Sequence, residues 1–467
     1  MNKDQKKSSE HQISRREALR MMTFGSIGLA MGGSVLQSCA PKNSSAGASA
    51  IKMSAPDGTR IVTRKWEALG EEVGLLGLGC MRLPQLPKGQ GRPGQLDQDK
   101  VNEMVDYALE HGINYFDTAP AYGDSERAVG EALQRHERSS YLLATKMSNF
   151  NRGHLPSFEE AKAMFEKSLA NLHTDYFDFY LLHCLESAKD FIVRFTENGL
   201  LDWLFEQKAA GRIHHLGFSF HGSNSDFDEL LNSKYKWDFV QIQMNYIDWK
   251  DMGSTPESPC DAETLYKALE SRGIPVVIME PIRGGALANI GKGLKDKLAE
   301  KYPSLSPAGV ALTFAASFPG VLCTLSGMSN MAQLKENIAT FTDFKPFNDK
   351  DNEFLMKMAG LYNANPHIPC TGCQYCMPCP NGVNIPANFA LLNSASDELL
   401  LPDLEGPRDK EFKRNSKELV KRYKQNLIDG SRADACTQCG VCLSKCPQHI
   451  RIPEQLERIQ NLIDQIS

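Results

Sequence analysis

The stretch Ile113-Asn114-Tyr115-Phe116-Asp117 is a short apolar run, which here ends on a carboxylate. It is one of eight short apolar runs between residues 73 and 326. Longer amphipathic segments separate the runs, which is the alternation of strands and helices typical of a parallel sheet. Eight strand–helix units in roughly 270 residues match the size of a closed (β/α)8 barrel. The sequence therefore predicts an α/β fold with a TIM barrel at its centre.

The individual elements can be placed from these patterns. The expected strands are residues 73–80, 113–117, 141–146, 177–183, 215–219, 239–245, 275–279 and 321–326. Helical patterns cover residues 99–110, 126–134, 158–171, 262–271, 307–316 and 331–340. We assign residues 61–345 to the barrel.

The composition and net charge of the chain exclude some classes of function. The chain has 467 residues, of which 41% are hydrophobic, so it can bury a sizeable core. Its 52 basic and 57 acidic residues give a net charge of −5, so no nucleic-acid partner is expected. Eight of the thirteen cysteines lie in the last hundred residues. Such clustering favours metal binding over scattered disulfides.

The first 38 residues have the features of an export signal. Ser14-Arg15-Arg16 is followed by an uncharged stretch, residues 21–36, which is too short to span a bilayer. The paired arginines resemble the twin-arginine (Tat) signal, although Ala18 and Arg20 depart from its usual pattern. This implies the Tat export machinery as a partner and a location outside the cytoplasmic membrane, either periplasmic or anchored to that membrane's outer side.

A cysteine follows this leader. Leu36-Gln37-Ser38-Cys39 resembles a lipobox, so Cys39 is either a lipidated N-terminus that anchors the protein to the membrane or a thiol near a plain cleavage site. Residues 39–60, rich in Ser and Ala, are expected to be a flexible tether.

Polar side chains close the expected barrel strands, at the rim where such barrels carry their chemistry. They are Asp117, Tyr122, Lys146 and His183. In type and order they resemble the catalytic tetrad of the aldo/keto reductase superfamily, and the resemblance covers roughly residues 73–344. It implies that a carbonyl and an alcohol are interconverted with a nicotinamide cofactor.

The chemistry suits these residue types. Carbonyl reduction requires a proton on oxygen, and a phenol with a pKa near ~10 is a poor acid without help. We expect Lys146 to lower the pKa of Tyr122, Asp117 to hold Lys146, and His183 to donate to the substrate oxygen.

The resemblance also implies residues that hold NADP or NAD. Ser219 and Gln241 match contacts to the nicotinamide, and the segment after the eighth strand matches the adenosine-phosphate site through Gly327, Met328, Ser329, Gln333 and Asn337. Three departures stand out: Phe220 replaces a common Asn, Met279 replaces a stacking aromatic, and no Lys or Arg lies between residues 324 and 334. The choice between NAD and NADP is open, and His221 is expected to be a solvent-exposed loop residue.

The tail, residues 367–467 after a linker at 346–366, carries two related cysteine runs. The runs are Cys370-x2-Cys373-x2-Cys376-x2-Cys379-Pro380 and Cys436-x2-Cys439-x2-Cys442-x3-Cys446-Pro447. The second has the spacing of a bacterial [4Fe-4S] ferredoxin. We expect a small, mainly helical ferredoxin-like domain with two [4Fe-4S] clusters, each taking three cysteines from one run and the fourth from the other. Two zinc sites are the alternative.

The whole resembles aldo/keto reductases fused to a ferredoxin-type domain. The predicted function is an exported oxidoreductase that acts on a small carbonyl or alcohol substrate and is linked through its clusters to an unidentified redox partner. Two alternatives are an electron-transfer or assembly protein whose barrel does not turn over, and a reductase whose clusters are only structural. No flavin site is apparent that would convert hydride transfer into single-electron transfer.

Overall fold

A computed structural model describes residues 52–54, 57–87, 89–92, 94–150, 154–252, 260–363, 367–398, 400–402, 404 and 406–467. The predicted signal, Cys39 and most of the predicted tether lie outside these residues. Among the described residues, no helix is long and apolar enough to cross a bilayer.

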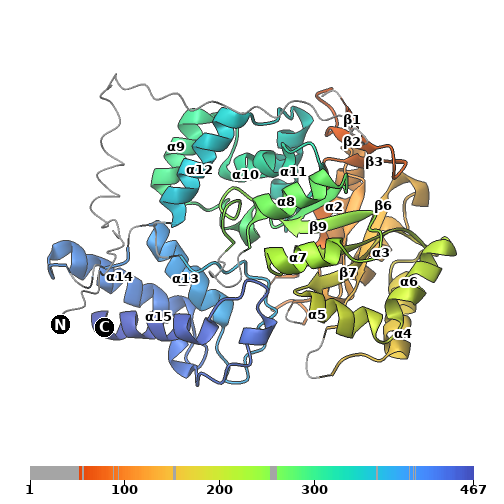
Figure 1. Ribbon diagram of the computed structural model, residues 1–467. Coiled ribbons are helices and arrows are strands. Elements are labelled where there is room, and N and C mark those ends of the chain that lie inside the picture. The colour runs from red at the N-terminus through yellow and green to blue at the C-terminus, as the bar shows by residue number, and fades with distance from the viewer. Residues whose placement is uncertain are drawn as a thin grey trace, which may run out of the picture.

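Eight parallel strands close into a barrel, as predicted (Figure 1). Neighbouring strands pair in the order β10-β11-β4-β5-β6-β7-β8-β9. The barrel strands are β4 (Leu76–Gly79), β5 (Tyr115–Asp117), β6 (Leu142–Met147), β7 (Phe177–Leu185), β8 (Ile213–Phe220), β9 (Phe239–Gln243), β10 (Val276–Met279) and β11 (Val321–Ser326). Every residue of β6 and β7 is buried, as expected for strands covered by helices on one face and by the barrel core on the other.

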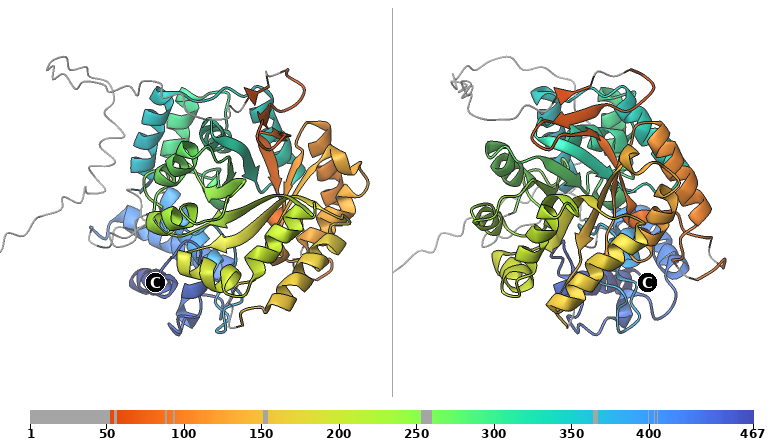
Figure 2. Two further views of the ribbon diagram at one scale, coloured as in Figure 1. Left: turned by 45° about the vertical axis from the view of Figure 1, so that its right-hand side comes forward. Right: turned by 90° about the vertical axis from the view of Figure 1, so that its right-hand side faces the viewer.

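Helices surround the barrel in both views of Figure 2. They are α2 (Gln98–Glu110), α3 (Ser125–Leu133), α4 (Phe158–Asn171), α5 (Ala188–Phe191), α6 (Leu200–Ala209), α7 (Asn224–Leu231), α8 (Ala262–Ser271), α9 (Lys292–Lys301), α10 (Pro307–Ala316) and α11 (Met331–Thr342). Local signals fix their ends. Ser157 and Glu160, for example, form a capping box that starts α4.

The predicted first strand, residues 73–80, is two strands. β3 (Glu71–Gly74) pairs antiparallel with β2 (Thr63–Trp66), which also pairs with β1 (Lys52–Met53), whereas β4 belongs to the barrel. The chain changes sheet at Leu75. Trp66 of this small sheet packs with Tyr115 and Phe179 inside the barrel, so the sheet closes the end of the barrel at which the strands begin. The predicted tether therefore contributes one strand to it.

The segment predicted as a linker, 346–366, contains helix α12 (Asp349–Asn363). Leu355 and Tyr362 of α12 are buried in the same core as the barrel helices, so much of this segment is part of the barrel's outer layer.

The C-terminal region is a second, mainly helical unit with its own core. It contains α13 (Ile385–Asp397), α14 (Lys410–Asn426) and α15 (Ile452–Ile466), drawn in blue below the barrel in Figure 1. Phe389, Leu419 and Leu456 of these helices are buried together. We call residues 367–467 the cysteine-rich domain.

The two cysteine runs share a backbone path. Gly372 and Gln374 have φ angles of 66° and 64°, and the matching Gln438 and Gly440 have 55° and 75°. Non-glycine residues rarely adopt a left-handed backbone. Its occurrence at both pairs of matched positions therefore indicates that the two runs share a loop shape. The internal repeat in the sequence thus corresponds to a repeat in the structure.

Candidate active site and cysteine groups

A buried ion pair lies at the end of the barrel where its strands finish. Lys146 donates from Nζ to Asp117 Oδ1 at 2.6 Å and to the carbonyl of Thr118 at 2.8 Å. Lys146 is fully buried and Asp117 is 3% exposed, so each charge depends on the other for compensation. The pair comes from adjacent strands because Asp117 ends β5 and Lys146 lies near the end of β6.

Tyr122 and His183 complete the predicted tetrad at one place. Lys146 Nζ lies 4.8 Å from the centre of the Tyr122 ring, and the rings of Tyr122 and His183 meet edge to face with centres 5.6 Å apart. Ser148 Oγ is 2.7 Å from Nδ1 of His183, which fixes the orientation of the imidazole. The structure therefore brings the four predicted side chains together.

The pKa of Tyr122 is shifted in the direction opposite to the one expected from the sequence. Burial raises the pKa of Tyr122 well above its usual value, reinforced by the nearby Tyr375 and Asp117, instead of Lys146 lowering it. Burial also lowers the pKa of Lys146, opposed by Asp117. Asp117 thus neutralises much of the field that Lys146 would exert on the phenol. Tyr122 is therefore held as a protonated phenol, which can donate a proton to a carbonyl oxygen but is a weaker acid in this structure than the sequence predicted.

The residues predicted to bind the cofactor divide into two sets. Ser219, Gln241 and Gly327 line the pocket above the tetrad, and Gln241 also donates to Asp117 at 3.2 Å. Met328, Ser329, Gln333 and Asn337 are not among its lining residues.

The second set has partners of its own. The Ser329 N–H donates to Gln333 Oε1 at 2.8 Å, and Asn337 is buried and donates to Ser326 at 3.0 Å. The uncharged amides and hydroxyl of the first set fit a nicotinamide. At the start of α11, however, the N–H groups of Ser329 and Gln333 already have partners, so a phosphate there would have to displace them.

The departures from the family pattern can be located. Phe220 is buried and packs on Phe227, with ring centres 4.8 Å apart, whereas Met279 lines the pocket. His221, predicted to face solvent, also lines the pocket and is only partly exposed. Burial lowers its pKa to about 4, so the imidazole is neutral at physiological pH.

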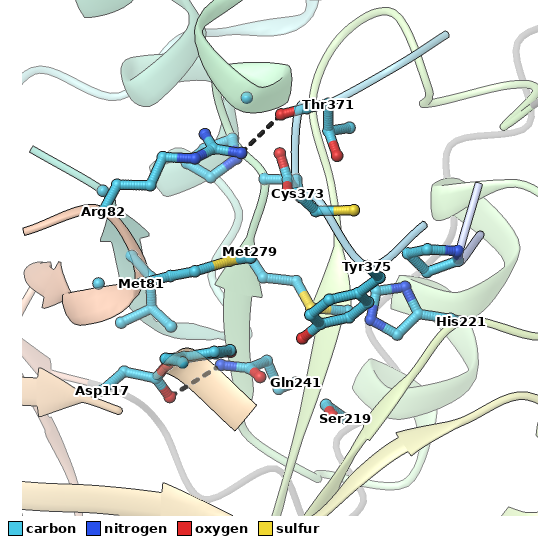
Figure 3. A pocket seen from close by; sticks show the side chains of 18 of the residues that line it. Met81, Arg82, Asp117, Ser219, His221, Gln241, Met279, Thr371, Cys373 and Tyr375 are labelled. Atoms are coloured by element: carbon cyan, nitrogen blue, oxygen red, sulfur yellow. Dashed lines mark hydrogen bonds between the residues drawn. The ribbon is translucent and has the colours of Figure 1, made fainter. Parts of the chain in front are cut away.

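Both domains line the pocket, as Figure 3 shows. Barrel residues Met81, Met279 and Gln241 lie on one side, and Thr371, Cys373 and Tyr375 of the cysteine-rich domain lie on the other. The pocket has a volume of about 110 Å³ and remains open to solvent on one side. The cysteine-rich domain is therefore part of the site.

Hydrogen bonds join the two domains at the pocket and beside it. Arg82 donates to the carbonyl of Thr371 at 2.6 Å, and the amides of Gln243 and Gln448 exchange hydrogen bonds of 2.9 and 3.4 Å. His449 Nε2 lies 3.1 Å from the carbonyl oxygen of His221, to which it can donate. These bonds hold the cysteine-rich domain over the carboxyl ends of the barrel strands.

The eight cysteines form two groups that mix the runs. Cys370, Cys373, Cys376 and Cys446 surround one small cavity of the cysteine-rich domain. We call them the inner group because Cys373 also lines the pocket. Cys436, Cys439 and Cys379 lie close enough to Cys442 to contribute to the rise of its pKa, and with it they form the outer group; Cys439 is exposed. Each group thus takes three cysteines from one run and the fourth from the other, the expected pairing.

The spacing of the cysteine sulfurs indicates whether they would hold a zinc ion or an iron–sulfur cluster. In a tetrahedral zinc site with Zn–S bonds near ~2.3 Å, the sulfurs lie roughly 3.8 Å apart. Among the described residues, no three cysteine sulfurs lie within 4.8 Å of one another, and none of these cysteines is in a disulfide. Burial raises the pKa of Cys370 to about 11, so metal binding there must displace a proton. Four thiols at wider spacing fit an iron–sulfur cluster better than zinc.

The pocket residues that were not predicted from the sequence include Arg82, Glu280, Tyr375 and Gln448. The position of Glu280 directly after a strand was visible and could have suggested it. Tyr375 and Gln448 carry no such signal, because their role depends on how the two domains meet.

Comparison with known proteins matches both parts of the chain. The aldo/keto reductase family profile matches residues 75–358, and a 4Fe-4S dicluster domain profile matches residues 369–451. The latter supports an iron–sulfur domain.

Similar proteins cover mainly the barrel. L-galactose dehydrogenase of Arabidopsis thaliana is 26% identical over 321 residues, covering 65% of this chain and 95% of its own. The uncharacterized oxidoreductase YqkF of Bacillus subtilis (strain 168) is 28% identical over 298 residues, covering 57% and 87%. Among solved structures, aldo-keto reductase AKR11C1 from Bacillus halodurans in its holo form is 25% identical, with a TM-score of 0.49 and coverage of 66% and 96%.

Proposed function

The chain belongs to the aldo/keto reductase family of NAD(P)-linked oxidoreductases, and from this we propose that it interconverts a small carbonyl compound and its alcohol, with electrons linked to two [4Fe-4S] clusters. The observation that carries the proposal is that Cys373, of the inner cysteine group, lines the same pocket as Tyr122, Asp117 and His183. A cluster held there would border the reacting atoms, which a purely structural cluster has no need to do.

The barrel residues account for the proton. In the reducing direction Tyr122, protonated and beside His183, is placed to donate to the substrate oxygen. Asp117 holds Lys146 with its Nζ 4.8 Å from the centre of the Tyr122 ring, where the cation can act on the tyrosinate left after proton transfer, although the Asp117 carboxylate offsets part of that effect. Ser219 and Gln241 would orient the nicotinamide, which when bound supplies or accepts the hydride.

The number of clusters matches the number of electrons. Oxidation of one alcohol to a carbonyl releases one proton and a hydride, which the oxidised nicotinamide would accept. Reoxidation of that nicotinamide would release a second proton and two electrons, one for each cluster. The inner group borders the pocket, while Cys439 of the outer group is exposed. This order, pocket to inner group to outer group to surface, supports an electron path toward an external carrier.

Export is a further part of the proposal. Tat export carries proteins already folded, which suits a protein that must receive its clusters where iron and sulfide are available. Anchoring through Cys39 is the alternative to a free periplasmic protein. Expression of the full chain with Arg15 and Arg16 replaced by Lys should leave it in the cytoplasm, and a periplasmic location of this variant would contradict Tat export.

The principal experiment is a visible spectrum of the anaerobically purified protein. We expect a broad iron–sulfur absorption that decreases when NADH or NADPH is added, and that returns when a carbonyl substrate is then supplied. Turnover of aldehydes by NAD(P)H without any change in this band would support a reductase with structural clusters. A band without any turnover would support an electron-transfer protein.

A further inference from the structure

The lining of the pocket has apolar and polar parts. Met81, Met279 and Leu325 make part of its lining apolar, which suits a flat ring. Tyr375 and His221, which lie next to each other in Figure 3, add hydrogen-bonding groups to the lining. A ligand that fills this pocket therefore meets both apolar surface and hydrogen-bonding groups.

Glu280 is an unusual member of the pocket. It directly follows β10, lines the pocket and has a φ angle of 54°, a conformation that costs energy for a residue with a side chain. The Gly284 N–H donates to its carboxyl group, but Oε2 is buried and has no hydrogen-bond partner among the described residues. A buried carboxylate oxygen without a donor is costly, and a bound ligand can supply that donor.

Charges around Glu280 restrict what that ligand can be. Burial raises the pKa of Glu280 and the cation of Arg82 opposes that rise. An anionic ligand group would therefore add negative charge beside a carboxyl group that is already costly to ionise, and the cation of Arg82 disfavours a cationic ligand group. Arg82 itself is bonded to the Thr371 carbonyl and lines the same pocket. An uncharged hydrogen-bond donor, such as a hydroxyl group, can bond to Glu280 Oε2 without the electrostatic cost that an anionic or a cationic group would carry.

The polar part of the pocket lining is equally free of net charge. His221 is neutral, Tyr375 is a phenol, and Gln448 presents an amide held by Gln243. These groups both donate and accept hydrogen bonds, as hydroxyl groups do. Tyr375 and Gln448 belong to the cysteine-rich domain, so that domain contributes to recognition.

We propose that Glu280 is a specificity-determining residue that accepts a hydrogen bond from a hydroxyl group of an uncharged, polyhydroxylated substrate, with Tyr375 and Gln448 contacting further hydroxyls. The assignment rests on the proposed function for the reacting group, but the binding contact does not require turnover. Its test can therefore be made separately.

The test compares two probes of equal carbon number, erythritol with four hydroxyl groups and 1-butanol with one. Their binding to the anaerobic full-length protein is measured by ligand-observed NMR, without nicotinamide. We expect the wild type to bind erythritol more tightly. Glu280→Met should weaken erythritol binding about ten-fold, because a hydrogen bond to a charged group is lost, and should leave 1-butanol binding unchanged.

Two further variants secure the interpretation. Glu280→Gln keeps the shape and one acceptor oxygen, so it should fall between wild type and Glu280→Met even if the latter folds poorly. Glu186→Gln changes a partly buried carboxyl that lines the neighbouring cavity, and should have no effect. Equal binding of both probes by the wild type, or unchanged erythritol binding in both Glu280 variants, would overturn the assignment. A protein that binds erythritol through Glu280 but reduces no aldehyde would instead contradict the proposed function alone.

Discussion

Cys373 of the cysteine-rich domain and Tyr122 of the barrel line the same pocket. Barrels of this class carry their chemistry on the loops at the carboxyl ends of the strands, and here the second domain covers that rim. The two redox functions inferred from the sequence therefore meet at one place. Separating the domains would open the site as well as remove the clusters.

The first prediction concerns which cysteines share a cluster. Cys446 belongs to the inner group and Cys379 to the outer one. Cys446→Ser should thus change the same electron paramagnetic resonance signal of the reduced protein as Cys373→Ser, and Cys379→Ser the same signal as Cys439→Ser. Clusters confined to single runs would reverse this pattern, with Cys446→Ser resembling Cys439→Ser.

The second prediction concerns the proton donor. Tyr122→Phe should lower the rate of carbonyl reduction about 10²- to 10⁴-fold, because the proton donor is lost while the ring is kept. The measurement is NADPH oxidation with any aldehyde that the wild type reduces, alongside the visible spectrum, which should not change. Tyr107→Phe on the outer helix α2 is the matched control. Full activity in Tyr122→Phe would show that the tetrad assignment is wrong.

The sequence predicted the barrel well because burial on both faces produces continuous apolar runs. Strands β10 and β11 agree with prediction almost to the residue. The first strand failed because residues 73–80 stay apolar across the change of sheet at Leu75, so composition gave no sign of the break.

Site residues could be predicted from the sequence only where the end of a strand fixes the position of a side chain. Asp117, Lys146 and His183 follow from the barrel, and the fourth-cysteine exchange follows from the repeat. The contacts of Tyr375 and Gln448 with the pocket depend on how two separately folded cores pack together. That packing is set by scattered bonds such as Arg82 to Thr371, which no local pattern encodes.

The third prediction concerns the buried ion pair. Lys146→Met would leave Asp117 buried without its partner, and should cost about 3–5 kcal/mol of unfolding free energy. Lys100→Met removes an ion pair at the surface with Asp97 and should leave the stability close to that of the wild type. Thermal unfolding followed by circular dichroism distinguishes the two. Adding Asp117→Asn to Lys146→Met should recover stability, and a further loss would argue against the pairing.

The fourth prediction is a pH dependence from His221. Its pKa is about 4 in the folded protein against 6.5 for a free side chain. The unfolded chain therefore binds more protons in this interval, and stability falls as the pH drops below about 6.5. The whole loss, reached near pH 4, is at most about 3 kcal/mol. Melting temperatures between pH 8 and 5 should fall less steeply in His221→Gln than in the wild type, whereas the exposed His154→Gln should follow the wild type.

The last prediction tests how the domains are joined. A β-carbon at Gly284 would lie 2.1 Å from the carbonyl oxygen of Thr371, whereas one at Gly285 would meet nothing within 4 Å. Both glycines have positive φ angles, 64° and 100°, so substitution by Ala strains the backbone at either site, by about 1–2 kcal/mol. Only Gly284→Ala also pushes the cysteine-rich domain away from the barrel. We therefore expect Gly284→Ala, but not Gly285→Ala, to speed proteolytic cleavage between the domains and to weaken the response of the iron–sulfur band to NADPH. Equal behaviour of the two variants would mean that the contact with Thr371 does not hold the domain in place.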